Sequence, residues 1–181
     1  GAVPFHSWIP DTYQGAPTPI TAFLSIAPKA AAFAILIRMF YVALITFKPM
    51  WVLLFVVASI VSMTYGNIVA IAQKNIKRLL AYSSIAHAVY ALLGFVSGTD
   101  AGAEATMTYA YLYVFMTLGA FAVVIALGRR GESLDGYRGL AAQRPATAAL
   151  MLLFLLSLAG IPPTAGFTAK FVVILSVVRA G

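Results

Sequence analysis

The chain alternates long apolar runs with short polar connections. Five runs can be separated, at residues 17–47, 51–73, 79–97, 105–128 and 146–179. The middle three contain no Asp, Glu, Lys or Arg. A helix needs about 20 apolar residues to cross roughly 30 Å of hydrocarbon, and it satisfies its own backbone polar groups. The pattern therefore predicts an all-α, polytopic membrane helix bundle, with residues 1–181 as a single transmembrane domain.

The first and last runs and the start of the chain depart from simple spans. Both runs exceed 30 residues, so they must tilt, kink or contain an interfacial turn. In the last run, two prolines between Gly160 and Gly166 prevent an uninterrupted helix. Residues 3–14 are too short and polar for a span and form either a surface turn or one end of a span. Both ends of the chain resemble cut ends, with no signal peptide, so we expect a longer polytopic protein.

Composition excludes several other classes of protein. Hydrophobic residues make up 62% of the chain, charged residues only 9%, and the mean hydropathy is +0.94. An average soluble domain is about 25% charged, so a soluble globular enzyme, a disordered tail and a nucleic-acid module are excluded. The net charge of +7 sits in short clusters between apolar runs. Without cysteine, the chain cannot hold an iron–sulfur cluster or a thiolate zinc site.

Loop charge predicts the orientation of the spans. The connections 74–78 and 129–145 contain seven Lys and Arg residues. The connections on the opposite side contain one, Lys48, together with the acids Asp100 and Glu104. Because cytoplasmic loops are enriched in Lys and Arg, the two basic connections should face the cytoplasm.

Lys29 is a charged residue near the centre of the first run. A charge at mid-span costs about 2.5–3.5 kcal/mol on insertion scales, and such residues usually face a bundle interior or a water path. Pro28 frees the carbonyl four residues before it, which offers an acceptor to the ammonium or to a water. Lys29 is therefore a candidate functional residue. The alternative is a structural charge satisfied by that carbonyl or by an acid elsewhere.

Lys170 follows the interruption between Gly160 and Gly166 in the last run. Unwound backbone at membrane depth is tolerated where protein or a water cavity covers it, and discontinuous helices mark ion sites in transporters. The interruption and the lysine are independent signals at one place, which favours a functional role. The alternative is a turn before a short interfacial helix, with Lys170 extending to the interface.

His87 occupies the middle of the third run. Imidazole titrates near neutral pH and can relay protons, but a histidine that only hydrogen-bonds between helices explains the residue equally well. The fourth run adds tyrosine hydroxyls on more than one face, at Tyr109, Tyr111 and Tyr113. These hydroxyls either order water between helices or pack the helices together.

The remaining polar residues favour structural roles. Arg38 lies far enough along the first run to reach the outer interface, Lys77 and Arg78 are mainly topology signals, and Asp11 is interpreted as a capping or interfacial residue. The sequence contains no Gly-rich phosphate loop, metal-ligand spacing or Ser-His-Asp set. No acid lies within any of the five runs.

Several motifs resemble the antiporter-like membrane subunits of respiratory complex I, the proton-translocating NADH:quinone oxidoreductase. They are PFHSWIPD and YQGAP within residues 4–17, NIKRLLAYSSIAH at 75–87, YRGL at 137–140, and LAGIPPTAGF followed by Lys170 within 158–171. The resemblance extends over nearly the whole chain, and this set of motifs is highly specific to the family.

The resemblance implies a fold and a site. Residues 3–14 would be the second half of a broken seventh helix, followed by five spans that end in a discontinuous twelfth helix. Lys29 would be the central lysine of the eighth helix, Lys170 the lysine of the twelfth, and His87 a histidine of the tenth. The family's glutamate in the fifth helix and lysine in the seventh would lie upstream. Pro28 departs from the family, which usually has a small or hydroxyl residue there.

The function implied by the resemblance is proton translocation through Lys29, His87 and Lys170 and intervening water, coupled to quinone reduction elsewhere. The enzyme would use NADH, FMN, iron–sulfur clusters and quinone, with no cofactor in this chain. The expected partners are other membrane subunits and lipid, without nucleic acid, in the inner (plasma) membrane of a bacterium. Two alternatives stay open: a subunit of a multisubunit cation/proton antiporter, and a structural scaffold whose lysines are merely satisfied charges.

Overall fold

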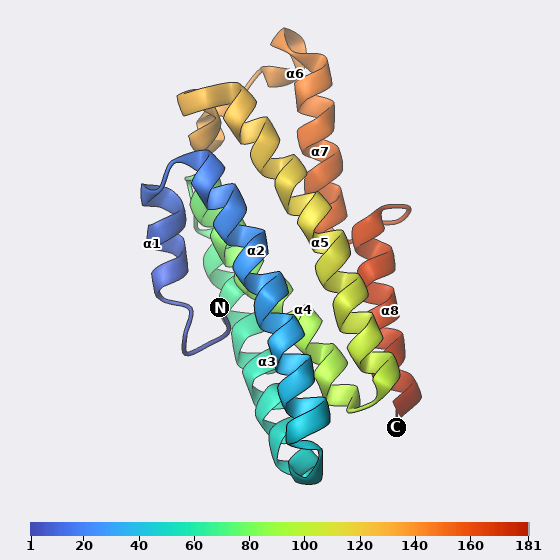
Figure 1. Ribbon diagram of the computed structural model, residues 1–181. Coiled ribbons are helices and arrows are strands. Elements are labelled where there is room, and N and C mark those ends of the chain that lie inside the picture. The colour runs from blue at the N-terminus through green and yellow to red at the C-terminus, as the bar shows by residue number, and fades with distance from the viewer. Residues whose placement is uncertain (181) are drawn as a thin grey trace.

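The computed structural model describes residues 1–180 and shows a bundle of elongated helices (Figure 1). The helices are α1 (Trp8–Gly15), α2 (Thr18–Ile37), α3 (Lys48–Ile71), α4 (Ile76–Ser97), α5 (Asp100–Leu127), α6 (Leu140–Gln143), α7 (Pro145–Ala159) and α8 (Ala165–Ala180). Shorter helical turns occupy Arg38–Ala43, Ile45–Phe47, Gly128–Glu132 and Leu134–Tyr137. Within residues 1–180 the only β pairing is an isolated bridge between Asn75 and Ser133. The predicted all-α fold class is confirmed.

Among residues 1–180, four helical stretches are long and apolar enough to cross a membrane. They are Thr18–Ala43, Ile45–Ile71, Ile76–Ser97 and Asp100–Glu132. The run predicted at 17–47 continues beyond α2 as a π-helical turn to Ala43, and a 3-10 turn at Ile45–Phe47 then leads into α3. Asp100 and Glu104, which the sequence analysis places in a connection, instead lie in the first turns of α5. The Thr99 side chain accepts the Gly102 N–H and so begins the helix there.

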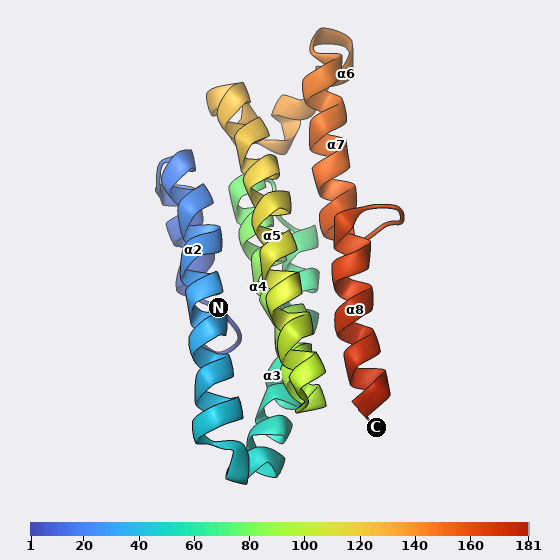
Figure 2. The same ribbon diagram turned by 45° about the vertical axis from the view of Figure 1, so that its right-hand side comes forward.

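The predicted last run forms two helices placed end to end. Figures 1 and 2 show α7 and α8 following one another along α5, with a projecting loop between them. α7 ends at Gly160, whose φ of 82° suits a residue without a Cβ. With 15 and 16 residues, each helix is about 22–24 Å long and falls short of a bilayer core by itself. The two together make one discontinuous span, as the two prolines predict.

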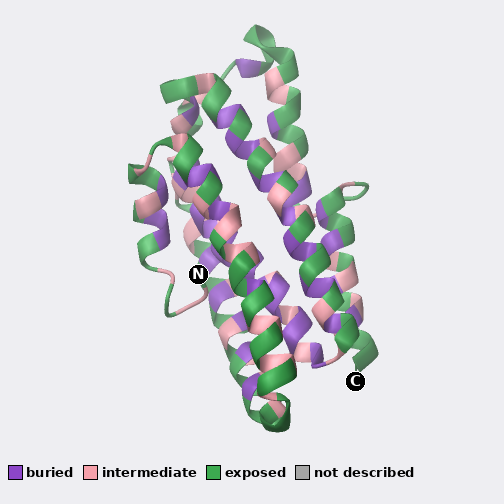
Figure 3. Ribbon diagram, in the orientation of Figure 1, coloured by how far each residue is buried: buried purple, intermediate pink, exposed green. Residues whose placement is uncertain are grey.

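α4 is the central helix of the bundle. It packs against α1, α3, α5 and α8. Of its apolar stretch 72% is buried, against 22% for the stretch that contains α2. Figure 3 shows broad exposed faces on α2 and α3, where residues such as Ile35 and Ile60 are apolar. The polar side chains of α4 therefore lie inside the protein, whereas the outer helices present surfaces suited to hydrocarbon or to further membrane helices.

The two basic connections lie together at one end of the bundle. The backbone N–H of Leu134 donates to the carbonyl of Lys74 at 3.0 Å. The Lys77 ammonium lies 3.4 Å from the Glu132 carboxylate and donates to the carbonyl of Ala16 at 2.8 Å. This end, called the basic end below, consists of residues 72–78 and 128–144. It also meets the junction between α1 and α2.

α4 and α5 approach each other closely at small residues. Thr106 Oγ1 donates to the carbonyls of Ala91 at 3.0 Å and Gly102 at 2.9 Å. A Cβ on Gly94 would lie 2.5 Å from the Gly102 carbonyl oxygen, and a Cβ on Gly102 would collide with the Gly94 carbonyl oxygen. Small residues at such crossings allow membrane helices to pack closely.

Replacing Gly102 with alanine should therefore destabilise the bundle. We expect Gly102→Ala to lower the free energy of unfolding by about 1–3 kcal/mol, the usual cost of overpacking. The midpoint of thermal unfolding of the full-length protein in detergent measures this effect. Gly15→Ala is a matched control, because a Cβ at Gly15 meets nothing within 4 Å. Equal midpoints for the two variants would show that the close crossing does not constrain stability.

Candidate functional site

Lys29 reaches from α2 to the centre of α4. Its ammonium donates to the backbone carbonyl of Ser84 at 2.7 Å and lies 5.3 Å from the centroid of the Tyr113 ring. The partner is thus a carbonyl of the neighbouring helix, and not the carbonyl that Pro28 frees within α2. Lys29 is half-buried in the described chain.

His87 is buried among tyrosine rings. Its side chain lies on α4, and Nδ1 is 2.6 Å from the hydroxyl oxygen of Tyr109. The rings of Tyr109, Tyr113 and Tyr90 have centroids 6.1, 5.2 and 6.1 Å from the imidazole. Tyr111 is 65% exposed. Residues two positions apart lie on nearly opposite faces of a helix, so Tyr111 points away from Tyr109 and Tyr113. Of the three tyrosines singled out in the fourth run, Tyr109 and Tyr113 line the site and Tyr111 does not.

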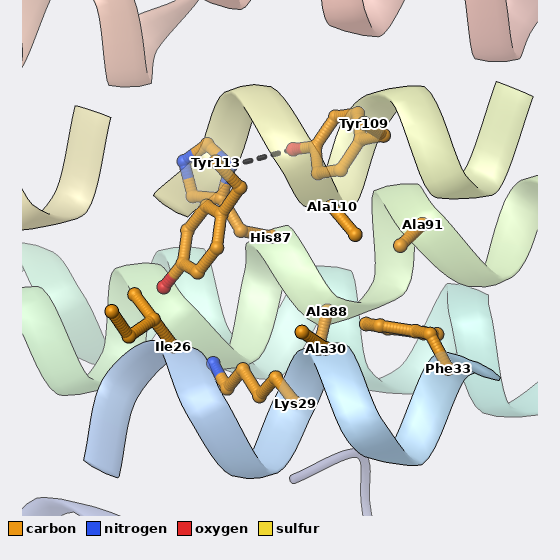
Figure 4. Close-up of a pocket in the computed structure, with 10 residues that line it drawn as sticks. All are labelled: Ile26, Lys29, Ala30, Phe33, His87, Ala88, Ala91, Tyr109, Ala110 and Tyr113. Carbon is orange, nitrogen blue, oxygen red and sulfur yellow. Dashed lines mark hydrogen bonds between the residues drawn. The ribbon is translucent and has the colours of Figure 1, made fainter. Parts of the chain in front are cut away.

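A small cavity separates Lys29 from His87. It has a volume of about 10 Å³, and its lining includes Lys29, His87, Tyr109 and Tyr113. Figure 4 shows these side chains converging from α2, α4 and α5, with the hydrogen bond between Tyr109 and His87 as a dashed line. Such a volume corresponds to about one water-sized probe. Most of the lining is apolar, and the side chains of Lys29, His87, Tyr109 and Tyr113 supply its polar groups.

Lys170 binds the end of the interrupted helix. Its ammonium donates to the carbonyls of Leu158 at 3.1 Å and Ala159 at 2.9 Å, which belong to the last turn of α7. The last carbonyls of a helix lack intrahelical partners and carry the negative end of its dipole. A Cβ on Gly160 would lie 2.8 Å from Lys170 Cδ, so the glycine also makes room for the lysine stem. The interruption and the lysine thus form one structural unit.

The three candidate residues form a row across the bundle. The Lys170 ammonium lies 4.6 Å from the centroid of the Tyr90 ring. A groove of about 430 Å³ is lined by His87, Tyr90 and Lys170, among others. His87 therefore borders both the small cavity beside Lys29 and the groove beside Lys170. The structure brings together residues from α2, α4 and α8 that are far apart in sequence.

Lys77 is buried, although its place in a basic connection predicts a residue that mainly sets topology. Its side chain is only 3% exposed and links Ala16 to Glu132, whereas a topology signal would extend into water. Lys77 precedes Ser84 by seven residues, or two helical turns, so the two residues share one face of α4. This spacing is the feature of the sequence that indicates burial of Lys77. Arg78 pairs with Asp11 at 2.6 Å near the surface, and Arg38 is exposed. Among residues 1–180, no group of three or more His, Cys, Asp and Glu is placed to hold a metal ion.

Comparison with known proteins matches this arrangement to one family. The family model described as "NADH:quinone oxidoreductase/Mrp antiporter, TM" matches residues 1–181. The chain belongs to this family of membrane proteins. The resemblance noted from the motifs is therefore confirmed.

Individual relatives place the chain more closely. It is 52% identical to NADH-quinone oxidoreductase subunit N 2 of Solibacter usitatus, over 99% of this chain and 37% of that protein. The respiratory complex I structure from Thermus thermophilus contains a similar chain, with a TM-score of 0.83 and 40% identity, over 99% of this chain and 39% of that one. The chain thus spans under two-fifths of the relatives it matches.

A third likeness concerns the fold alone. A chain of the Mrp complex from Dietzia has a TM-score of 0.85 and 24% identity, over 99% of this chain and 34% of that one. That chain therefore shares the helix arrangement of this one.

The hydrogen bond between Tyr109 and His87 should contribute to stability. Both residues are at most 5% exposed, so Tyr109→Phe leaves a buried imidazole nitrogen without this partner. We expect a loss of about 1–3 kcal/mol in the free energy of unfolding, measured by denaturation in detergent. Tyr111→Phe, at an exposed position on the same helix, should change little. A similar effect of both variants would indicate that the observed bond contributes nothing.

Proposed function

We propose that this chain is the proton-translocating part of subunit N of a bacterial NADH:quinone oxidoreductase. The observation that carries the proposal is the row formed by Lys29, His87 and Lys170 inside the bundle. Two ammonium groups at membrane depth are costly, and here they flank a histidine that borders a space of water size. The identity of 52% to a protein named subunit N supports the choice of enzyme.

The partners of the two lysines suit a change of protonation state. Among residues 1–180, carboxylates pair with Lys77, Arg78 and Arg138, and neither Lys29 nor Lys170 has a carboxylate within ion-pair distance. Both bind neutral backbone carbonyls. An uncharged amine still has N–H groups to donate to a carbonyl, whereas a carboxylate partner would favour only the ammonium. Each lysine can therefore release a proton and keep its hydrogen bond.

The proposed path runs from the basic end to the opposite side of the membrane. A proton from the cytoplasm loads Lys29, passes by water, His87 and tyrosine hydroxyls to Lys170, and leaves outward. His87 has two ring nitrogens and can accept at one while it donates at the other. The driving force would be a change of charge in neighbouring subunits, coupled to quinone reduction elsewhere in the enzyme.

The setting of this subunit follows from the same proposal. Its partners would be other membrane subunits of the complex and the lipids of the bacterial inner (plasma) membrane. NADH, FMN, iron–sulfur clusters and quinone would bind in other parts of the enzyme, and redox chemistry would take place there. The chain has no cysteine, so it supplies no thiolate for a cluster.

A subunit of a multisubunit cation/proton antiporter is the second candidate. The fold likeness to a chain of the Mrp complex favours it, since one fold can serve several activities. A gene next to quinone-reductase subunits supports the first candidate, and a gene next to antiporter subunits supports the second. Proton movement that requires NADH, and not a sodium gradient, separates the two in membranes.

Alanine at Lys29 or Lys170 tests the proposed site. In the assembled enzyme in proteoliposomes, each substitution should lower the number of protons translocated per NADH oxidised, while the complex still assembles. The reason is that each variant removes a group that holds the proton. A pH-sensitive dye together with NADH absorbance measures both quantities in one sample.

Lys74→Ala is the matched control, because Lys74 is an exposed lysine at the basic end. It should translocate protons like the unchanged enzyme. If Lys29→Ala and Lys170→Ala both pump normally, the lysines are structural charges and the chain acts as a scaffold.

A further inference from the structure

A cluster of buried hydroxyl groups lies between Lys29 and the basic end. It consists of Tyr13 on α1, Ser84 on α4, and Tyr113 and Thr117 on α5, with exposed fractions of 1, 1, 6 and 3%. Ser84 precedes His87 toward the start of α4, and Thr117 follows Tyr113 toward the end of α5. Both directions lead to the basic end, where α4 begins and α5 ends. The cluster is thus on the side of Lys29 that faces the predicted cytoplasm.

Ser84 and Tyr113 both lie beside the Lys29 ammonium, which is 2.7 Å from the Ser84 carbonyl oxygen and 5.3 Å from the centroid of the Tyr113 ring. Thr117 lies one helical turn beyond Tyr113 on the same face of α5. Ser84 Oγ and Thr117 Oγ1 are buried without a hydrogen-bond partner. A buried hydroxyl without a partner costs about 1–3 kcal/mol, which water between such groups would relieve. Water beside Ser84 and Thr117 would supply the missing partners.

The cluster directly adjoins the lysine. The backbone carbonyl of Ser84 accepts the hydrogen bond from Lys29, and its side-chain hydroxyl belongs to the cluster. One residue therefore contacts the lysine and contributes to the cluster. Figure 4 shows the Tyr113 hydroxyl and the Lys29 amine both pointing toward Ile26, which lies closer than Lys29 to the start of α2.

Neighbouring hydroxyls do not belong to the cluster. Ser25 donates to the carbonyl of Ala22 at 2.6 Å, and Thr21 donates to the carbonyl of Tyr13 at 3.0 Å. Their protons are engaged in bonds to the backbone, which leaves Ser84 and Thr117 as the hydroxyls with unused capacity.

We propose that Tyr13, Ser84, Tyr113 and Thr117 form the branch that loads Lys29 with protons from the basic end; this rests on the proposed function. Each hydroxyl oxygen, or a water between two of them, accepts a proton on one side and gives up its own on the other. The last proton binds the lone pair of the neutral Lys29 amine and makes an ammonium. No net charge stays on the hydroxyls, so none of them has to ionise permanently.

The contacts at the basic end hold this branch in place. Lys77 binds the carbonyl of Ala16, three residues after Tyr13, and also approaches Glu132. These bonds hold the end of the short helix α1. The Tyr13 ring packs edge-on against the Phe121 ring, with their centroids 6.4 Å apart. The position of the Tyr13 hydroxyl thus depends on α1 staying docked.

Hydroxyl removal in the full-length subunit tests the proposal. Tyr113→Phe, Thr117→Val and the double variant each keep the shape of the side chain and delete only the polar group or groups. In proteoliposomes with the assembled enzyme, we expect the double variant to lose as much of the proton yield per NADH as Lys29→Ala does. Thr117→Ser should retain the unchanged yield, because it keeps the hydroxyl and removes a methyl group.

Tyr111→Phe is the control for the aromatic change and should also pump normally. The proposal is overturned if the double variant pumps like the unchanged enzyme while Lys29→Ala does not. If the double variant does not assemble, the same comparison is made with Thr117→Val. Loss in both Thr117→Val and Thr117→Ser overturns it as well, since packing would then explain the effect. Normal pumping by Lys29→Ala is a separate outcome, because it rejects the proposed function itself.

Discussion

The hydrocarbon core of a membrane supplies no hydrogen bond to an ammonium group, so any lysine placed there must find acceptors within the protein. Lys29 and Lys170 meet this requirement in different ways. Lys29 shares a carbonyl in the middle of α4, whereas Lys170 binds the free carbonyls at the end of α7. The interruption of the last span thus creates the acceptors that allow a charge at that depth. Continuous helix at Gly160 would remove both the acceptors and the room for the lysine.

α4 connects the two lysines because of how its polar residues are spaced. Ser84, His87 and Tyr90 are three residues apart, and three residues turn a helix by about 300°. Each step therefore shifts the side chain by about 60° around the helix axis. The backbone carbonyl of Ser84 accepts from Lys29 of α2, the His87 side chain meets Tyr109 of α5, and the Tyr90 ring lies beside Lys170 of α8. Polar groups at these successive positions therefore let α4 contact three neighbouring helices, α2, α5 and α8.

The same helix arrangement occurs in respiratory complex I and in an Mrp complex. One helix arrangement can thus serve more than one membrane complex. The exposed apolar faces of α2 and α3 agree with such surroundings, since lipid and neighbouring helices are equally suitable contacts for them.

Much of the fold and part of the site follow from the sequence alone. Apolar run length indicates membrane helices, the two prolines after Gly160 indicate the interruption, and Lys29, His87 and Lys170 stand out because polar residues are rare in such runs. These features are local, since they depend on the transfer energy of each residue and on backbone restrictions of proline. Loop charge likewise anticipates that the two basic connections lie at one end.

Only the tertiary structure decides which groups meet. The partner of Lys29 is the Ser84 carbonyl and not the one freed by Pro28, and Lys77 is buried against Ala16 although the sequence places it in a basic connection. Asp100 and Glu104 lie in a helix because Thr99 caps it. Every helix interior offers many equivalent carbonyls, so pattern and composition do not distinguish among them. The relative rotation and height of packed helices select the contacts, and these depend on side chains distributed over the whole bundle.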